Sequence, residues 1–158
     1  MTSRVQLALN VNDLTQAVEF YRKLFGAEPA KLKPGYANFA IADPPLKLVL
    51  IENPGHGGSL NHLGVEVAGT EAVAAAQQRL ERQGLTTVSE DGVACCYALQ
   101  DKIWVDGPAG EPWEIYTVLD DVDTMGGSIK DLDPQCGPNV CCGAEAPTDA
   151  PVAAQKCC

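Results

Sequence analysis

The feature that most constrains the fold of this chain is an order of predicted elements that occurs twice. Residues 4–53 are predicted to form a strand, a helix and further strands, and residues 60–119 repeat that order over a similar length. An internal repeat of this size is typical of folds built from paired modules. We therefore expect two modules of about 50 to 60 residues each, related by a pseudo-two-fold axis.

The first module begins with a strand whose side chains alternate between two faces. Over residues 4–11 the apolar side chains share one face, and Gln6 lies on the other. Asp13 then occupies the N-cap position of a helix with a regular apolar stripe, and Gly26 ends that helix. Two further strands are predicted, at residues 37–42 and 46–52.

The second module follows the same plan. A strand over residues 60–67 has apolar side chains on one face and carries His62 on the other, and a helix over residues 71–83 follows it. Glu90-Asp91-Gly92 is interpreted as a turn. The remaining strands are predicted at residues 85–89, 94–100, 102–106 and 113–118.

Charge and cysteine content exclude several kinds of partner. Eleven Lys and Arg residues against 21 Asp and Glu residues give a net charge of −10, which argues against nucleic acid or an anionic membrane surface as the main partner. No segment has the length of a membrane-spanning helix, and the N-terminus has no signal-peptide core, so we expect a cytoplasmic protein. Seven cysteines, an odd number, fit reduced thiols better than a secreted disulfide framework.

The last part of the chain differs from the modules. Residues 120–158 are acidic and rich in Gly and Pro, and we predict a flexible tail beyond a domain that spans residues 1–119. The tail is either a thiol-bearing appendage or a segment without chemistry, and activity is expected to survive its removal at about Leu119. Its cysteines are Cys136, Cys141, Cys142, Cys157 and Cys158.

Three polar side chains are candidates for a metal site. Gln6 and His62 occupy matching places on the first strands of the two modules, and Glu114 lies on the last strand. Paired modules would bring all three into the cavity between the sheets. The matching strand of the first module offers Lys47, which is no usual ligand, and apolar residues, so three protein ligands with open positions are expected. Taken singly, each of the three has an ordinary structural interpretation.

Cys95 and Cys96 are adjacent in the sequence, so in a regular strand they could not act together. Neighbouring side chains in a strand point to opposite faces, and a disulfide between adjacent residues is strained. Two hypotheses follow: a pair of small buried hydrophobic residues, or a clamp of two thiolates for one thiol-seeking atom. The clamp requires the backbone to leave strand geometry, in a segment that we expect to be mobile. Lys102, close by, is either an assisting charge or a solvated lysine.

The paired modules resemble the vicinal oxygen chelate superfamily, which includes glyoxalases and extradiol dioxygenases. Within it, several stretches are similar to the ArsI/CadI group of carbon–arsenic lyases and cadmium-induced proteins. They lie at residues 5–11, 33–40, 60–66, 95–96, 104–108 and 113–117. The resemblance implies an α+β fold of two βαβββ modules that form a cup, and for this fold a homodimer is common.

The resemblance also implies a function: an iron(II) enzyme that uses dioxygen to demethylate trivalent methylarsenicals to arsenite, in organoarsenical detoxification and arsenic resistance. Carried over by position, Gln6, His62 and Glu114 would hold the iron. Cys95 and Cys96 would be catalytic and hold the arsenic, with Lys102 as a further substrate-binding residue. The substrate would be methylarsenite or an aryl arsenical.

Three alternatives stay open. The chain could sequester arsenic or cadmium through its thiols without turnover. It could be another metal-dependent dioxygenase of the same fold, although adjacent cysteines have no evident use there. It could also be a member whose site has decayed, leaving a structural cysteine pair, but the retained Gln6, His62 and Glu114 pattern argues against that.

Overall fold

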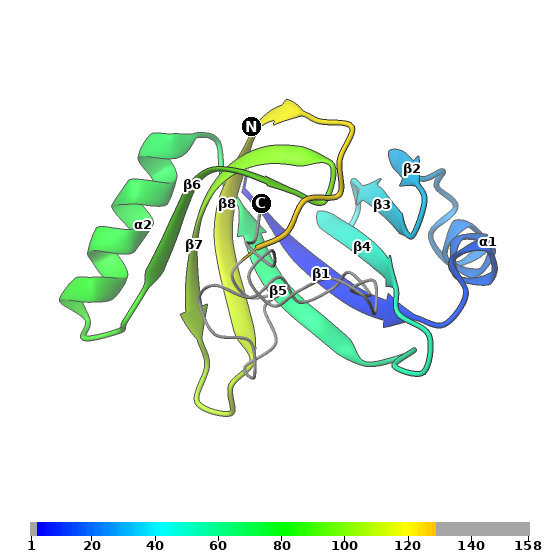
Figure 1. The fold of residues 1–158 in the computed structure, drawn as a ribbon, viewed down its shortest axis with the longest axis horizontal. Coiled ribbons are helices and arrows are strands. Elements are labelled where there is room, and N and C mark those ends of the chain that lie inside the picture. The colour runs from blue at the N-terminus through cyan, green and yellow to red at the C-terminus, as the bar shows by residue number, and fades with distance from the viewer. Residues whose placement is uncertain (1–2, 129–158) are drawn as a thin grey trace, which may run out of the picture.

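The computed structural model describes residues 3–128 and shows two βαβββ modules in succession (Figure 1). The α+β fold class and the repeat are confirmed. The first module contains β1 (Arg4–Val11), α1 (Leu14–Phe25), β2 (Lys31–Lys33), β3 (Tyr36–Ile41) and β4 (Leu46–Glu52). The second contains β5 (Leu60–Glu66), α2 (Thr70–Arg82), β6 (Val88–Cys95), β7 (Ala98–Asp106) and β8 (Pro112–Asp121).

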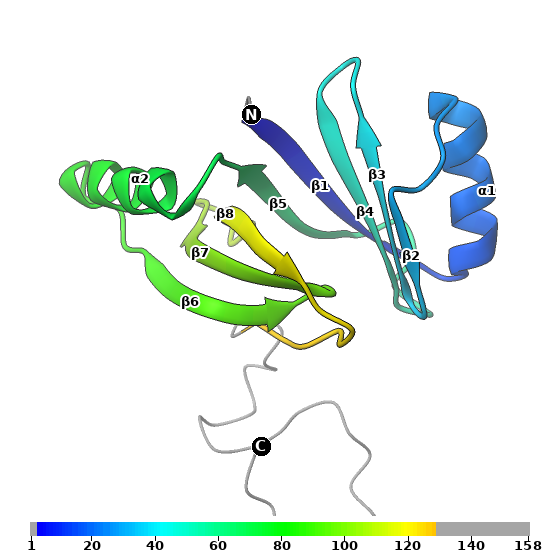
Figure 2. The same ribbon diagram turned by 90° about the horizontal axis from the view of Figure 1, so that it is seen from above.

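All strands within the described residues belong to one mixed sheet of eight strands in the order β2-β3-β4-β1-β5-β8-β7-β6. The two modules meet where β1 pairs with β5 in antiparallel fashion, and each first strand pairs in parallel with the last strand of its own module. Figure 2 shows the sheet bent at this junction, with α1 and α2 on its outer faces. The concave face between the two halves is therefore free to hold a site.

The alternation of the first strands divides the molecule into an apolar outer layer and a polar inner one. Leu48 and Leu50 of β4 are buried in the hydrophobic core under α1. Leu7 and Leu9 of β1 pack against the same core. The helix begins and ends as predicted, because Asp13 caps it at its start and Gly26 takes a left-handed conformation after it. The inner faces carry buried polar side chains, which must be paired to offset the cost of burial.

Two interruptions predicted in the strands of the second module, at residues 90–92 and at Asp101, are wrong. A hydrogen bond between Gly92 and Asp101 links the two places across the β6–β7 hairpin. The supposed turn at residues 90–92 is a bulge within β6, and β7 continues through Asp101 without interruption. Gly92 has a φ of 59°, and its backbone N–H donates to the Asp101 carboxylate at 2.7 Å. A bulge and a turn use the same residue types, so the local sequence does not distinguish them.

The true turn of the β6–β7 hairpin lies at the adjacent cysteines. Cys95 ends β6, and the next two residues, Cys96 and Tyr97, have φ values of 57° and 59°. Two successive positive φ angles are the geometry of a tight hairpin turn of type I′. The prediction that the cysteine segment leaves strand geometry is confirmed, while its mobility stays a prediction.

The folded region extends beyond the predicted boundary at Leu119. β8 runs to Asp121, and residues 122–128 form a strap across the cysteine hairpin. Cys96 N–H donates to the Met125 carbonyl, and a Cβ on Gly126 would lie only 1.8 Å from the Ala94 carbonyl oxygen. A truncation that spares this strap must therefore cut after Ser128. The five tail cysteines lie outside the described residues.

Within residues 3–128, no helix is long and apolar enough to cross a membrane.

Candidate active site

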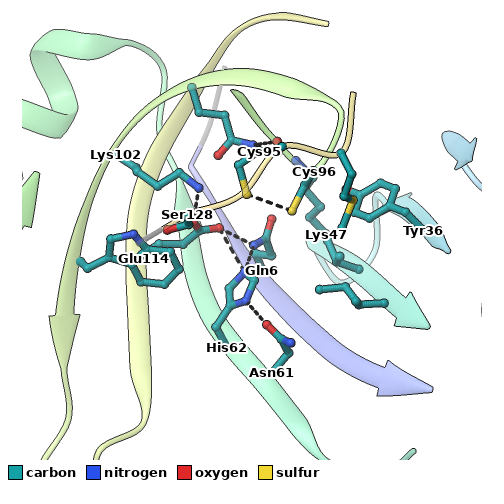
Figure 3. Close-up of a pocket in the computed structure, with 16 residues that line it drawn as sticks. Gln6, Tyr36, Lys47, Asn61, His62, Cys95, Cys96, Lys102, Glu114 and Ser128 are labelled. Carbon is teal, nitrogen blue, oxygen red and sulfur yellow. Dashed lines mark hydrogen bonds and ion pairs between the residues drawn. The ribbon is translucent and has the colours of Figure 1, made fainter. Parts of the chain in front are cut away.

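The concave face holds a cavity of about 170 Å³ that contains every site residue predicted from the sequence (Figure 3). Gln6, His62 and Glu114 lie together on its floor, and the thiols of Cys95 and Cys96 lie above them. Its wall also includes Tyr36, Lys47, Val49, Ile51, Asn61, Gln100, Lys102, Trp104, Met125, Gly126 and Ser128.

Strand register brings the three metal-ligand candidates together. Gln6 of β1 lies opposite Gly64 of β5, which in turn pairs with Glu114 of β8. Gly64 fits there because it has no side chain, and a Cβ would approach Glu114 Cγ to 3.0 Å. Gln6 Nε2 lies 2.6 Å from Glu114 Oε1 and 3.0 Å from His62 Nε2, and the last two atoms are 3.3 Å apart. The three donor groups thus converge on one point.

This set fits a metal ion such as iron(II). His62 Nδ1 lies 2.7 Å from the side-chain oxygen Oδ1 of Asn61, and the amide NH₂ of Asn61 donates to Asn10. Because Oδ1 can only accept, the imidazole proton is on Nδ1, and the lone pair of Nε2 faces the cavity. A half-turn of the Gln6 amide would direct its oxygen to the same point, and its NH₂ group would then donate to the Tyr116 hydroxyl. Among the described residues, no three His, Cys, Asp or Glu side chains form such a group, because the third donor here is an amide.

Replacing Asn61 with alanine is expected to weaken metal binding about 10- to 100-fold, because the His62 ring would lose the partner that fixes its tautomer and orientation. Anaerobic titration of the variant with iron(II) measures this change. Asn53→Ala is a suitable control, since Asn53 contacts Asn10 but has no hydrogen bond to the imidazole. An unchanged affinity in Asn61→Ala would show that the imidazole is oriented by other contacts.

The Glu114 carboxylate is kept ionised in a fully enclosed position. Burial would raise its pKa, but the adjacent His62 imidazole, 3.3 Å from Oε1, and the charge of Lys102 outweigh burial and lower the pKa to about 2. Lys102 Nζ lies 2.9 Å from Glu114 Oε2, and only 1% of Lys102 is exposed. The interpretation of Lys102 as a solvated lysine is therefore wrong.

The two cysteines are free thiols that face the cavity as a pair. Their sulfur atoms are 3.2 Å apart, which is too long for a disulfide and short enough for both to contact one atom. The hydrogen bond with Cys95, followed by burial, raises the pKa of Cys96, so that thiol is protonated at neutral pH. Gln100 supports the turn by donating to the Cys95 carbonyl at 3.1 Å.

Several cavity residues were not singled out from the sequence. Asn61 and Trp104 adjoin His62, and the strap residues close the cavity above the cysteines. Lys47, Val49 and Ile51 do face the cavity, as their alternation on β4 indicates, and they add no carboxylate, imidazole or thiol. The strap carries little sequence signal of its own, because backbone groups of residues 122–127 make hydrogen bonds to the hairpin, and one side chain, that of Ser128, donates to Glu90 of β6 at 2.8 Å.

The sequence of residues 4–115 matches the family model of the glyoxalase/bleomycin resistance protein/dioxygenase superfamily. The chain belongs to this superfamily. It is 61% identical over 124 residues to the trivalent organoarsenical cleaving enzyme of Thermomonospora curvata, covering 78% of this chain and 82% of that protein. It is 59% identical over 149 residues to the cadmium-induced protein CadI of Mycobacterium bovis, covering 94% of this chain and 98% of that protein. The resemblance to the ArsI/CadI group is confirmed.

Solved structures of other proteins share the fold at low sequence identity. An extradiol ring-cleaving dioxygenase from B. fuscum has a TM-score of 0.55 and 21% identity, over 76% of this chain and 34% of that chain. Methylmalonyl-CoA epimerase from Mycobacterium tuberculosis has a TM-score of 0.52 and 18% identity, over 72% of this chain and 85% of that chain. These likenesses extend to the fold alone.

Proposed function

We propose that this protein is a carbon–arsenic lyase that uses iron(II) and dioxygen to convert trivalent organoarsenicals such as methylarsenite into arsenite. One observation carries the proposal: a pair of free thiols and a set of three metal donors face the same cavity from different strands. The names of two relatives, the trivalent organoarsenical cleaving enzymes of Thermomonospora curvata and of a Bacillus species, support the class of substrate.

The thiol pair suits a trivalent arsenic atom that carries one carbon and two hydroxyl groups. Each Cys sulfur forms a bond to arsenic, each thiol proton leaves with a hydroxyl group as water, and the carbon–arsenic bond stays intact. Two sulfur atoms 3.2 Å apart are already close enough to bind one atom. The metal donors take no part in this capture, so Cys95 and Cys96 are substrate ligands in this proposal rather than metal ligands.

The residues around the captured arsenical then position it for cleavage. Iron(II) held by Gln6, His62 and Glu114 would supply the activation of dioxygen that breaks the carbon–arsenic bond, with one oxygen atom going to arsenic and the other to the carbon, which leaves oxidised. The clamp holds the methyl group within the same cavity, which turns a rare encounter into a positioned reaction. Lys102 keeps Glu114 in its ionised, ligating form.

The proposal is tested by loading the reduced protein with iron(II) and methylarsenite without oxygen, then admitting dioxygen and following arsenite. We expect arsenite from the wild type only after dioxygen is admitted, and none from Glu114→Ala. Tight binding of methylarsenite without arsenite formation would favour sequestration. Arsenite formed without dioxygen would contradict the role of iron and dioxygen.

The rate of methylarsenite capture is expected to rise with pH, by about tenfold per unit between pH 6 and 8, because the thiolate is the attacking form. The raised pKa of Cys96 keeps that thiol protonated at neutral pH, and each increase in pH enlarges its thiolate fraction. Stopped-flow fluorescence of Trp104, which lines the cavity, can follow capture in metal-free protein. A rate that levels off below pH 7 would show a thiol of lowered pKa instead.

A further inference from the structure

Two lysines line the cavity, and they differ in their partners. Lys102 forms an ion pair with Glu114 at 2.9 Å. Lys47 is also buried, with 9% of its surface exposed, yet its ammonium group has no hydrogen bond or ion pair to any described residue. Its Nζ lies 5.0 Å from the centroid of the Tyr116 ring. A buried ammonium group without a counter-ion is costly, so its presence in a cavity wall calls for a function.

The carboxylates near Lys47 are already paired with other cations. Glu66 accepts from Arg4 at 2.6 Å, and Glu114 is bound by Lys102. Lys31 pairs with Asp121 at the edge of an adjoining cavity of about 200 Å³, which Lys47 and Cys96 also line. Burial lowers the pKa of Lys47, and only the longer-range field of Glu66 and other anions opposes this effect. Among the described residues, the cavity wall therefore carries one unmatched cation.

Strand register fixes the position of this cation relative to the metal donors. Lys47 of β4 pairs directly with Gln6 of β1, so the two side chains lie on the same face of neighbouring strands. Figure 3 shows Lys47 on the side of the cavity below Cys96 and across from Lys102. A molecule held by the two thiols would thus have the metal donors on one side and Lys47 on another.

An aromatic ring on arsenic would need room beside Lys47. The cavity of about 170 Å³ also has to hold the captured arsenic atom between the thiols and the metal donors, so the ring would extend toward an adjoining cavity of about 200 Å³. Val49 and Ile51 of β4 and Met125 of the strap provide an apolar wall beside Lys47. The adjoining cavity offers further room past Cys96. A methyl group on arsenic is too small to reach into that adjoining cavity, whereas a ring can extend into it.

We infer that the site accepts aryl arsenicals whose ring carries an anionic substituent, such as a carboxylate, and that Lys47 binds that substituent. This inference rests on the proposed arsenical clamp and names the substrate class that the clamp would hold. Lys47 acts here as a specificity residue, since a neutral ring or a methyl group gains nothing from its charge. A charge-assisted hydrogen bond in an enclosed site would favour the anionic ring about tenfold or more.

The test compares two trivalent arsenicals of the same shape, 4-carboxyphenylarsenite and its neutral analogue 4-carbamoylphenylarsenite. Their affinities for the reduced, metal-free, full-length protein are measured without oxygen, by calorimetry at pH 7. The wild type should bind the carboxylate about tenfold more tightly than the carboxamide. Lys47→Met should reduce this ratio to about one, and Lys47→Arg should keep most of it, because arginine restores the charge.

Lys23→Met is the matched control, since Lys23 is exposed on α1 and pairs with Glu19. This control should keep the wild-type ratio. Equal affinities in the wild type would overturn the inference, and so would a ratio that persists in Lys47→Met. These results leave the clamp intact, because both arsenicals still bind. Failure of both arsenicals to bind the wild type would instead contradict the thiol clamp, and therefore also the role of Lys47.

Discussion

Cys95→Ser is expected to weaken methylarsenite binding by roughly two orders of magnitude or more, and Cys96→Ser should do the same. Arsenic bound to the first sulfur meets the second at a very high effective concentration, because the two sulfur atoms are already 3.2 Å apart. A serine hydroxyl is close to thiol in size but returns arsenic to an oxygen ligand that water readily replaces. Calorimetric titration of the metal-free protein without oxygen measures the loss.

The parent for this comparison is a chain whose five tail cysteines are replaced by serine, which leaves Cys95 and Cys96 as its remaining thiols. We expect the parent to bind methylarsenite as tightly as the wild type, at one equivalent per chain. A small effect of either single substitution in that parent would mean that one sulfur suffices, which contradicts a two-sulfur clamp. Weak binding by the parent itself would assign the capture to the tail.

Lys102→Met is expected to lower the free energy of unfolding of the metal-free protein by about 3 to 5 kcal/mol, because it leaves the Glu114 carboxylate buried without its cation. Methionine keeps the length and packing of the side chain, so the loss reports the charge. Urea denaturation measures it. The double variant Lys102→Met/Glu114→Gln removes both charges and should recover most of the loss.

The pH dependence of this loss provides a second check. In the folded wild type the pKa of Glu114 is about 2, below its ordinary 4.5, so the carboxylate contributes stability above pH 4.5 that is lost as the pH falls toward 2. In Lys102→Met that pKa should rise. The difference in stability between variant and wild type should therefore shrink as the pH falls below 4.5. A loss under 1 kcal/mol at pH 7 would show that Glu114 does not depend on Lys102.

The sequence allowed the site to be predicted where strand alternation and the repeat determine it. Gln6, His62 and Glu114 could be placed in one cavity because side-chain direction in a strand follows from position, and two similar modules pair in few ways. The two faces of β1 and β5 were assigned correctly for the same reason.

Features set by tertiary contacts could not be predicted in this way. The bulge in β6 depends on the hydrogen bond from Gly92 to Asp101 across the hairpin, which no local pattern reveals. Lys102 was open to a solvated interpretation because its burial results from pairing with Glu114 on the neighbouring strand. Lys47 lay on the expected face, but only the surrounding ion pairs show that it lacks a partner among the described residues.

The most direct test of a lyase with a thiol clamp is arsenic X-ray absorption of the iron(II)-loaded protein with one equivalent of methylarsenite, before and after dioxygen is admitted. Before oxygen, we expect arsenic bound to two sulfur atoms and one carbon. After oxygen, we expect the carbon to be lost and oxygen to take its place. An arsenic atom that keeps its carbon after oxygen, or that never has two sulfur ligands, would contradict a lyase built from a thiol clamp and a separate metal site.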